Sequence, residues 1–368
     1  MLFVLSDNVI TAAKEGDHHA IRVINDLCTA LRYGRHFMYA SRDGLTNIRE
    51  NDLLDKTAQR VAYGLEQGYA MRYSNLFGRV ETYISIEIGT SINVTTDSRG
   101  LTCITLPINE IYDDSVFLKC VLLLENSSEK EIYYQMRNFY SAENKYYVSC
   151  LFEVRLGGGN TTAKVFKDVV DDRRLCLCIC DSDKTYPSCP LGSTARGIIS
   201  FKTNHWPLCE VFTTDPFREV ENLIPFYLLL TLSTDNANLL RPCQEYQSIV
   251  ACNEEAYRYI DVKLGLNLKK FRNLDNDTFS FIQNLMVKSG IKTSSEVAFL
   301  CGLPDTDVDS RKEELILSCC SSHILDEYNS TYGSSPISRA NLTADQYSKW
   351  FYIGKQLYNW GYALGVIV

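Results

Sequence analysis

Acidic side chains follow two apolar runs of the sequence, in a pattern that could support metal chemistry. Glu125 ends the first run and Glu129 comes one helical turn later, while Asp181 and Asp183 follow another run. Grouped carboxylates repel one another unless a hard cation neutralises them, and their oxygen atoms suit Mg²⁺ or Mn²⁺. We expect a site for two such ions, which can activate water and stabilise the leaving oxygen in phosphodiester cleavage.

The segment that carries these residues alternates apolar runs with helical patterns. Strands are expected at Cys120–Leu124, Tyr146–Val154 and Leu175–Cys180, with further short strands at Gly197–Phe201 and Cys209–Thr213. Helices are expected between the first three strands, at Ser128–Tyr140 and Thr161–Val170. This order predicts a parallel sheet, in which ligands bind just past the carboxyl ends of the strands. The acidic residues stand at those ends.

The whole chain has 368 residues, 45% of them hydrophobic and 22% charged, which is typical of a globular protein with two or three domains. We expect an α/β fold with an N-terminal α/β or α+β accessory domain (1–115), a central catalytic domain (116–222) and a mainly helical C-terminal region (223–368). No stretch reaches about 18 consecutive apolar residues and no basic leader opens the sequence, so we predict a cytoplasmic protein without membrane spans.

Charge and cysteine content limit the function further. A formal net charge of −8 excludes recruitment of nucleic acid by a general positive field, so a polyanion has to be met locally by cations or metals. The 14 cysteines of an unexported chain are expected to be reduced. Cys176, Cys178 and Cys180 alternate along one strand and favour core packing over a metal tetrahedron, and adjacent Cys319 and Cys320 are interpreted in the same way.

Four motifs resemble, in order and spacing, the Toprim fold shared by topoisomerases, primases and the OLD and AriB-like nucleases. They are L-L-L-E-N-S-S-E (Leu122–Glu129), G-G-G-N (Gly157–Asn160), C-D-S-D (Cys180–Asp183) and R-E-V-E-N (Arg218–Asn222). They cover less than a third of the chain. The first has the E-x-x-x-E spacing of OLD-type nucleases, with Asn126 where glycine is usual.

The resemblance assigns roles to the acidic residues. It implies three principal metal ligands, Glu125, Asp181 and Asp183. It makes Glu129 a second-metal ligand or a water-positioning group. Glu221 is the candidate late ligand, and Glu219 could exchange roles with it, depending on where a helix begins.

A glycine segment, a loop and a lysine beside the expected site are further candidates for contact with a phosphate. Gly157–Asn160 is expected either to present backbone N–H groups at a helix start or to form a simple β–α turn. Lys184–Arg196 is expected to be an ordered loop that could contact a phosphate. Lys202 is a candidate cation for the developing charge of a transition state, with a solvated strand-end lysine as the alternative.

We therefore interpret the chain as a metal-dependent nuclease acting on DNA, tRNA or another RNA. The resemblance implies a bacterial anti-phage defence effector, possible homo-oligomers and, because no Walker motif is present, a separately encoded partner ATPase. Two alternatives stay open. Asp181-Ser182-Asp183-Lys184-Thr185 matches D-x-D-x-T of haloacid-dehalogenase-like phosphatases, in which Asp181 would attack phosphate. A non-catalytic interaction protein is the other.

Overall fold

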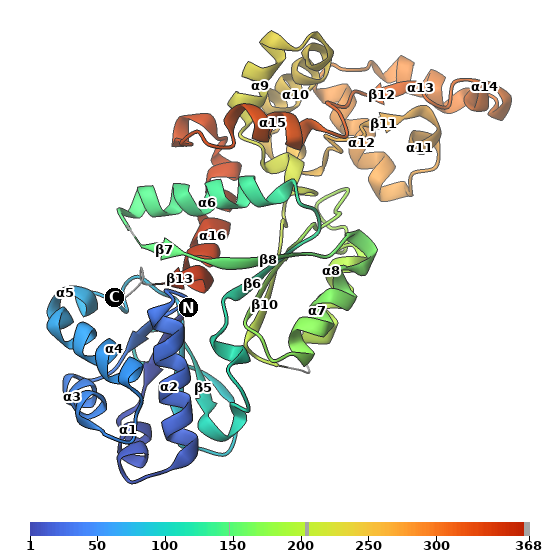
Figure 1. Cartoon of the computed structure of the whole chain (residues 1–368). Coiled ribbons are helices and arrows are strands. Elements are labelled where there is room, and N and C mark those ends of the chain that lie inside the picture. Colours follow the sequence, from blue (N-terminus) through green and yellow to red (C-terminus); the bar gives the residue numbers. More distant parts are fainter. Residues whose placement is uncertain (147, 203–205, 364–368) are drawn as a thin grey trace.

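The structure is a computed structural model that describes residues 1–146, 148–202 and 206–363. It is an α/β structure with two main sheets and a helical C-terminal region that projects beyond them (Figure 1). The expected α/β class with a parallel-sheet core is confirmed. Among the described residues, no helix combines the length and the apolar character that crossing a bilayer requires.

The N-terminal part is built on a five-stranded sheet in the order β2-β1-β3-β5-β4, in which only β4 is antiparallel to its neighbour. Its strands are β1 (Leu2–Leu5), β2 (Phe37–Tyr39), β3 (Thr82–Glu87), β4 (Asn93–Thr96) and β5 (Thr102–Pro107). Its helices are α1 (Asp7–Lys14), α2 (His18–Arg32), α3 (Arg42–Glu50), α4 (Lys56–Gln67) and α5 (Tyr69–Tyr73). This part is therefore itself α/β.

The central sheet is wholly parallel and has the order β10-β9-β6-β8. Its strands are β6 (Cys120–Leu124), β8 (Phe152–Leu156), β9 (Cys176–Cys180) and β10 (Cys209–Thr213), and its helices are α6 (Glu129–Asn144), α7 (Thr162–Asp171) and α8 (Ser193–Lys202). β6 and β9 are buried along their whole length, as continuous apolar runs predict. The chain runs from β6 outward to β8 and then crosses back to β9, so α6 covers one face and α7 and α8 the other (Figure 1).

Two strand predictions are wrong in detail. Gly197–Phe201 lies in α8, because parallel β9 and β10 need a crossover helix between them and a short apolar run fits either structure. The expected strand Tyr146–Val154 is divided. Its first half contains β7 (Ser149–Cys150), which pairs with β13 (Tyr362–Ala363). Its last residues belong to β8, which begins after β7 and pairs with β6.

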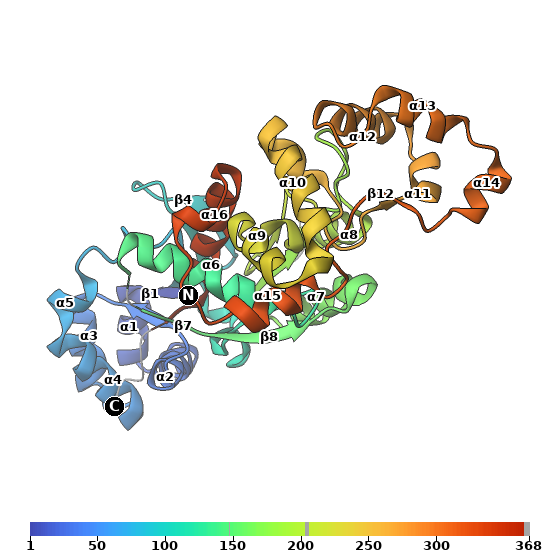
Figure 2. The same ribbon diagram turned by 90° about the horizontal axis from the view of Figure 1, so that it is seen from above.

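The C-terminal part is mainly helical. Its helices are α9 (Phe226–Asp235), α10 (Leu240–Cys252), α11 (Leu268–Arg272), α12 (Asn276–Lys288), α13 (Ser294–Gly302), α14 (Asp305–Ser310) and α15 (Ile324–Tyr332). A small antiparallel pair, β11 (Leu266–Asn267) and β12 (Leu315–Leu317), joins them. Figure 2 shows α11 to α14 as the end of the molecule farthest from the N-terminal sheet.

The last helix, α16 (Ala344–Gly361), connects all three parts. It runs back from the C-terminal lobe and packs along α6 (Figure 1). Near its start the indole N–H of Trp350 donates to the Leu223 carbonyl at 2.7 Å, and near its end Asn359 accepts the backbone N–H of Glu81 at 2.8 Å. α16 thus fixes the N-terminal sheet, the central sheet and the segment after β10 relative to one another.

Seven 3₁₀ turns complete the described elements, and two of them border the acidic strand ends. They are η1 (Ile108–Glu110), η2 (Ser115–Phe117), η3 (Gly159–Thr161), η4 (Val220–Leu223), η5 (Ala237–Leu239), η6 (Glu254–Tyr259) and η7 (Arg339–Asn341). All 14 cysteines are free thiols. Those of β9 are buried in the core, which confirms their packing role, and of the adjacent later pair Cys320 is buried while Cys319 is half-buried.

Candidate active site

The acidic residues lie at the ends of β6 and β9, two neighbouring strands whose following connections leave in opposite directions across the sheet. The chain leaves β6 toward β8 on one side, whereas β9 lies on the other side of β6. Side chains at the carboxyl ends of two such neighbours face a common crevice. Glu125 follows β6 and Asp181 follows β9, and the Asp181 backbone N–H donates to Oε1 of Glu125 at 3.1 Å. The two predicted ligands are therefore brought together.

Glu129 begins α6 and is 3% exposed. Its Oε2 accepts the backbone N–H of Glu125 at 3.2 Å, and its Oε1 accepts the backbone N–H of Asn126 at 3.0 Å. Burial, and then the charge of Glu125, raise the pKa of Glu129 to about 8. The Asn126 side-chain amide also donates to Oε1 at 3.2 Å, so Asn126 adds a further hydrogen bond to this turn. Glu129 thus orients the turn that carries Glu125.

Asp181 is joined to the segment after β10. Its Oδ1 accepts the backbone N–H of Val220 at 2.9 Å, which places η4 against the end of β9. Burial, followed by the charges of Glu129 and Glu221, raises the pKa of Asp181 well above its usual range. Several carboxylates therefore act on one another in this crevice, as the sequence predicts.

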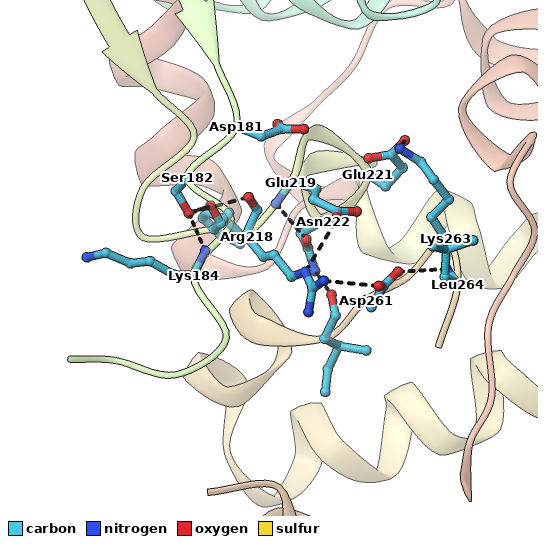
Figure 3. Close-up of polar contacts among 12 residues, drawn as sticks. Asp181, Ser182, Lys184, Arg218, Glu219, Glu221, Asn222, Asp261, Lys263 and Leu264 are labelled. Carbon is cyan, nitrogen blue, oxygen red and sulfur yellow. Dashed lines mark hydrogen bonds and ion pairs between the residues drawn. The ribbon is translucent and has the colours of Figure 1, made fainter. Parts of the chain in front are cut away.

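Glu221 lies within η4, is 4% exposed and carries an ion pair that the sequence did not indicate. The ammonium nitrogen of Lys263 is 2.7 Å from Oε1 of Glu221 (Figure 3). Although burial opposes the charged ammonium, the Glu221 carboxylate raises the pKa of Lys263. Oε2 of Glu221 is buried and has no hydrogen-bond partner among the described residues. A tethered cation therefore occupies part of the acidic crevice.

Glu219, the alternative to Glu221, has a different local role. It is the N-cap of η4, where it exchanges hydrogen bonds with Asn222 in a capping box. Its Oε1 is 3.2 Å from the guanidinium of Arg218, and burial raises its pKa. Because Glu219 holds the turn and Glu221 faces the charges of Asp181 and Lys263, the geometry favours Glu221 as the residue of the site.

Asp183 stands at the outer edge of this group. It is exposed, has a left-handed backbone with φ of 55°, and packs against Gly192, where a Cβ would lie 2.1 Å from Oδ2. Its charge, behind burial, contributes to a raised pKa of Glu125. Between Asp183 and Asp181, buried Ser182 donates to the Phe217 carbonyl at 2.7 Å. The D-x-D loop is thereby fastened to the segment after β10.

Lys202 does not lie in the acidic crevice. It ends α8 and forms an ion pair with Glu210, the second residue of β10. The crevice is at the other end of the parallel strands, so the proposed catalytic role of Lys202 is not supported, and an ion-paired surface lysine is the better description. Lys184 of the following loop is also paired, at 2.7 Å from Asp215.

The glycine segment supports the site through its backbone. The N–H of Gly157 donates to the Leu124 carbonyl at 2.7 Å, and the N–H of Gly158 donates to the Glu125 carbonyl at 3.0 Å. Gly158 and Gly159 have φ values of 70° and 62°, which glycine adopts without strain. These two N–H groups fix the end of β6, so the segment acts here as a β–α turn.

The carboxylates do not form a preformed metal cage. No group of three or more Asp, Glu, His or Cys side chains within the described part of the chain has an arrangement ready to hold a metal ion. The donor chemistry nevertheless fits a hard cation, because the charges of Glu129, Glu221 and Glu125 act on Asp181 and, among the described residues, buried Oε2 of Glu221 has no hydrogen-bond partner. Lys263 is paired with Oε1 of Glu221, so a metal ion that takes this oxygen would displace the ammonium.

Comparisons of the chain with protein-family models, with curated proteins and with solved structures find no match.

Proposed function

We propose that this chain is a Mg²⁺- or Mn²⁺-dependent nuclease with a Toprim-like central domain. The observation that carries the proposal is the hydrogen bond between Glu125 and the backbone of Asp181, which joins two acidic strand ends across the point where strand order reverses. Parallel sheets bind ligands at this point. Burial, and after it the charges of neighbouring carboxylates, raises the pKa of both Glu129 and Asp181.

Metal ligands in this proposal are Glu125, Asp181, Asp183 and Glu221. A bound divalent ion supplies Lewis-acid stabilisation of phosphate and of the attacking and leaving oxygens. Glu129 keeps the turn of Glu125 in place through two backbone hydrogen bonds. Lys263 lies beside these carboxylates, where its ammonium would offset charge on a phosphate. Lys263 thereby takes the role that the sequence suggested for Lys202.

The substrate class is DNA or RNA, including tRNA, and binding is expected to be local. The net charge of −8 gives no long-range attraction for a polyanion, so substrate capture depends on the metal or on a partner. We extend the proposal to a cytoplasmic anti-phage defence effector that a separately encoded ATPase restrains or recruits. Full, unregulated cleavage by the isolated chain would contradict this extension and leave the nuclease proposal intact.

The test is cleavage of labelled plasmid, single-stranded DNA and total tRNA with Mg²⁺, Mn²⁺ or EDTA. Wild type is compared with Asp181→Asn and Glu125→Gln, which keep the shape of each side chain and remove its charge. Glu313→Gln is the matched control, because Glu313 is exposed and lies outside the acidic group. We expect metal-dependent cleavage that falls more than about 100-fold in both site variants and is unchanged in the control.

Two other outcomes of these measurements would favour a different function. Release of phosphate from small phosphoesters without nuclease activity, abolished by Asp181→Asn, would favour a phosphatase in which Asp181 is the nucleophile. Absence of cleavage together with absence of Mg²⁺ or Mn²⁺ binding in calorimetry would favour an interaction protein, in which Lys263 permanently neutralises Glu221.

A further inference from the structure

A cleft that shares no residue with the acidic group borders the segment that follows β10. The cleft, of about 550 Å³, opens between β10 and α16, and its lining includes Phe212, Asp215, Arg258, Asp345, Lys349 and Tyr352. Its volume falls within the usual range of small-molecule sites. None of these residues belongs to the acidic crevice of Glu125 and Asp181, so the cleft needs a separate explanation.

The charged groups of the cleft are paired with one exception. Arg258 makes a two-pronged contact with Asp345, at 2.9 Å from Nε to Oδ2 and 2.6 Å from NH2 to Oδ1. Asp215 is paired with Lys184 at 2.7 Å. Within the described part of the chain, Lys349 is the cation of this lining whose ammonium contacts no carboxylate. The cleft therefore carries one positive charge that is not neutralised by direct contact.

Lys349 is fixed by two hydrogen bonds from its ammonium group, which keeps a third N–H for a ligand. Its side chain is 8% exposed, and Nζ donates to the Thr213 carbonyl at 2.8 Å and to the Asp215 carbonyl at 2.6 Å. An ammonium has three N–H donors, so one is left for a ligand. Burial lowers the pKa of Lys349 to about 8, against the attraction of the Asp215 carboxylate. An anion that reaches the ammonium would offset this cost of burial.

An aromatic surface lies next to this ammonium. Nζ of Lys349 is 5.2 Å from the ring centroid of Tyr352, and the edge-to-face contact between Tyr352 and Phe212 has a centroid distance of 5.7 Å. Tyr352 is 43% exposed, which leaves part of its ring accessible to a flat group. A charged contact and a stacking surface are thus within reach of one small molecule.

We propose that this cleft binds a small organic anion, in which a carboxylate or phosphate is attached to a flat aromatic ring. The anionic group accepts the free N–H of Lys349, and the ring packs on Tyr352. The proposal does not depend on nuclease activity. Lys349 holds the two carbonyls on either side of Thr214, and Oγ1 of Thr214 accepts the backbone N–H of Ser182 at 2.9 Å. Lys349 is therefore linked to the loop of Asp181 through its hydrogen bonds to the backbone on either side of Thr214 and the hydrogen bond between Thr214 and Ser182.

Isothermal titration calorimetry of the full chain in EDTA tests the proposal with AMP, benzoate and inorganic phosphate as probes. EDTA prevents binding through a divalent ion in the acidic crevice. We expect AMP or benzoate to bind more tightly than inorganic phosphate, with AMP identifying a phosphate ligand and benzoate a carboxylate ligand. Binding at pH 8.5 should take up protons, measured in two buffers of different ionisation enthalpy, because the anion favours protonated Lys349.

Substitutions inside and outside the cleft show whether the probe binds there. Lys349→Met should weaken it at least about tenfold, whereas Lys355→Met on the same helix, which removes a lysine paired with Glu81, should leave it unchanged. Ser348→Trp keeps Lys349 and fills the cleft from an exposed position, so it should also abolish binding. Undiminished affinity in both cleft variants, equal affinity for inorganic phosphate and AMP, or no binding of any probe at millimolar concentration would overturn the proposal.

Discussion

The ammonium of Lys263 lies 2.7 Å from the carboxylate of Glu221, inside the acidic group at the ends of β6 and β9. Lys263 follows η6 in the C-terminal part of the chain, whereas Glu221 belongs to η4 directly after the central sheet. The neutralising charge thus comes from a different part of the fold than the carboxylates. A metal ion that binds Oε1 of Glu221 has to compete with this ammonium, and an ion at Oε2 lies close to its positive charge.

Replacing Lys263 by methionine should destabilise the metal-free protein and increase its response to metal. The change leaves Glu221 buried without a counter-charge, which costs about 1–3 kcal/mol of unfolding free energy at a site where the lysine side chain is 30% exposed. Added Mg²⁺ should then raise the melting temperature more in Lys263→Met than in wild type, because the ion replaces the lost charge.

Exposed Lys288, at the end of α12, provides the control as Lys288→Met. Thermal unfolding with and without Mg²⁺ is the measurement, with EDTA as the metal-free reference. An equal Mg²⁺ response in wild type and Lys263→Met would show that Glu221 does not bind the ion.

Glu129 is expected to act by positioning Glu125. Glu129→Ala leaves two backbone N–H groups without acceptors and should lower the unfolding free energy by about 2–3 kcal/mol, whereas Glu129→Gln retains one oxygen acceptor and should lose about 1 kcal/mol. Chemical denaturation measures both values.

Cleavage kinetics separate positioning from metal binding at Glu129. A positioning role predicts that Glu129→Gln recovers most of the kcat lost in Glu129→Ala, with the Mg²⁺ dependence unchanged. A role as second-metal ligand predicts instead that both variants are similarly inactive and need more Mg²⁺, because an amide is a poorer ligand than a carboxylate.

The sequence predicts the part of the site that depends on residues directly following recognisable strands. Apolar runs identified β6 and β9, and the rule that parallel strands end at one edge brought Glu125 to Asp181. It could not predict Lys263, because that contact depends on how the C-terminal lobe folds back and no motif marks a single lysine. The strand predicted at Gly197–Phe201 is part of a helix, because five apolar and small residues fit a strand or a helix equally well.

Lys202→Ala should leave cleavage within about twofold of wild type, because Lys202 pairs with Glu210 at the opposite end of the strands. Lys263→Ala, measured in the same assay at saturating Mg²⁺, should lower kcat more strongly, since its ammonium borders the crevice. The reverse order of effects would restore Lys202 as the transition-state cation and remove Lys263 from that role.

Lys349 should make stability rise with pH over a defined range. Its folded-state pKa of about 8 is below the 10.5 of the unfolded chain, so between these values the unfolded state binds more protons. The contribution of Lys349 is therefore least favourable below about pH 8 and improves by up to about 1.4 kcal/mol per pH unit above it. The groups around it are Asp215, Arg258, Asp345 and Tyr352, of which the first three are held in ion pairs.

Chemical denaturation of wild type, Lys349→Met and Lys355→Met between pH 7.5 and 9.5 measures this contribution. Other groups titrate in the same range, so the informative quantity is the difference in unfolding free energy between each variant and wild type. Wild type should gain stability relative to Lys349→Met as the pH rises, while its difference from Lys355→Met stays constant. A constant difference for both variants would mean that Lys349 ionises as an ordinary surface lysine, and its ammonium would then not be a buried charge awaiting an anion.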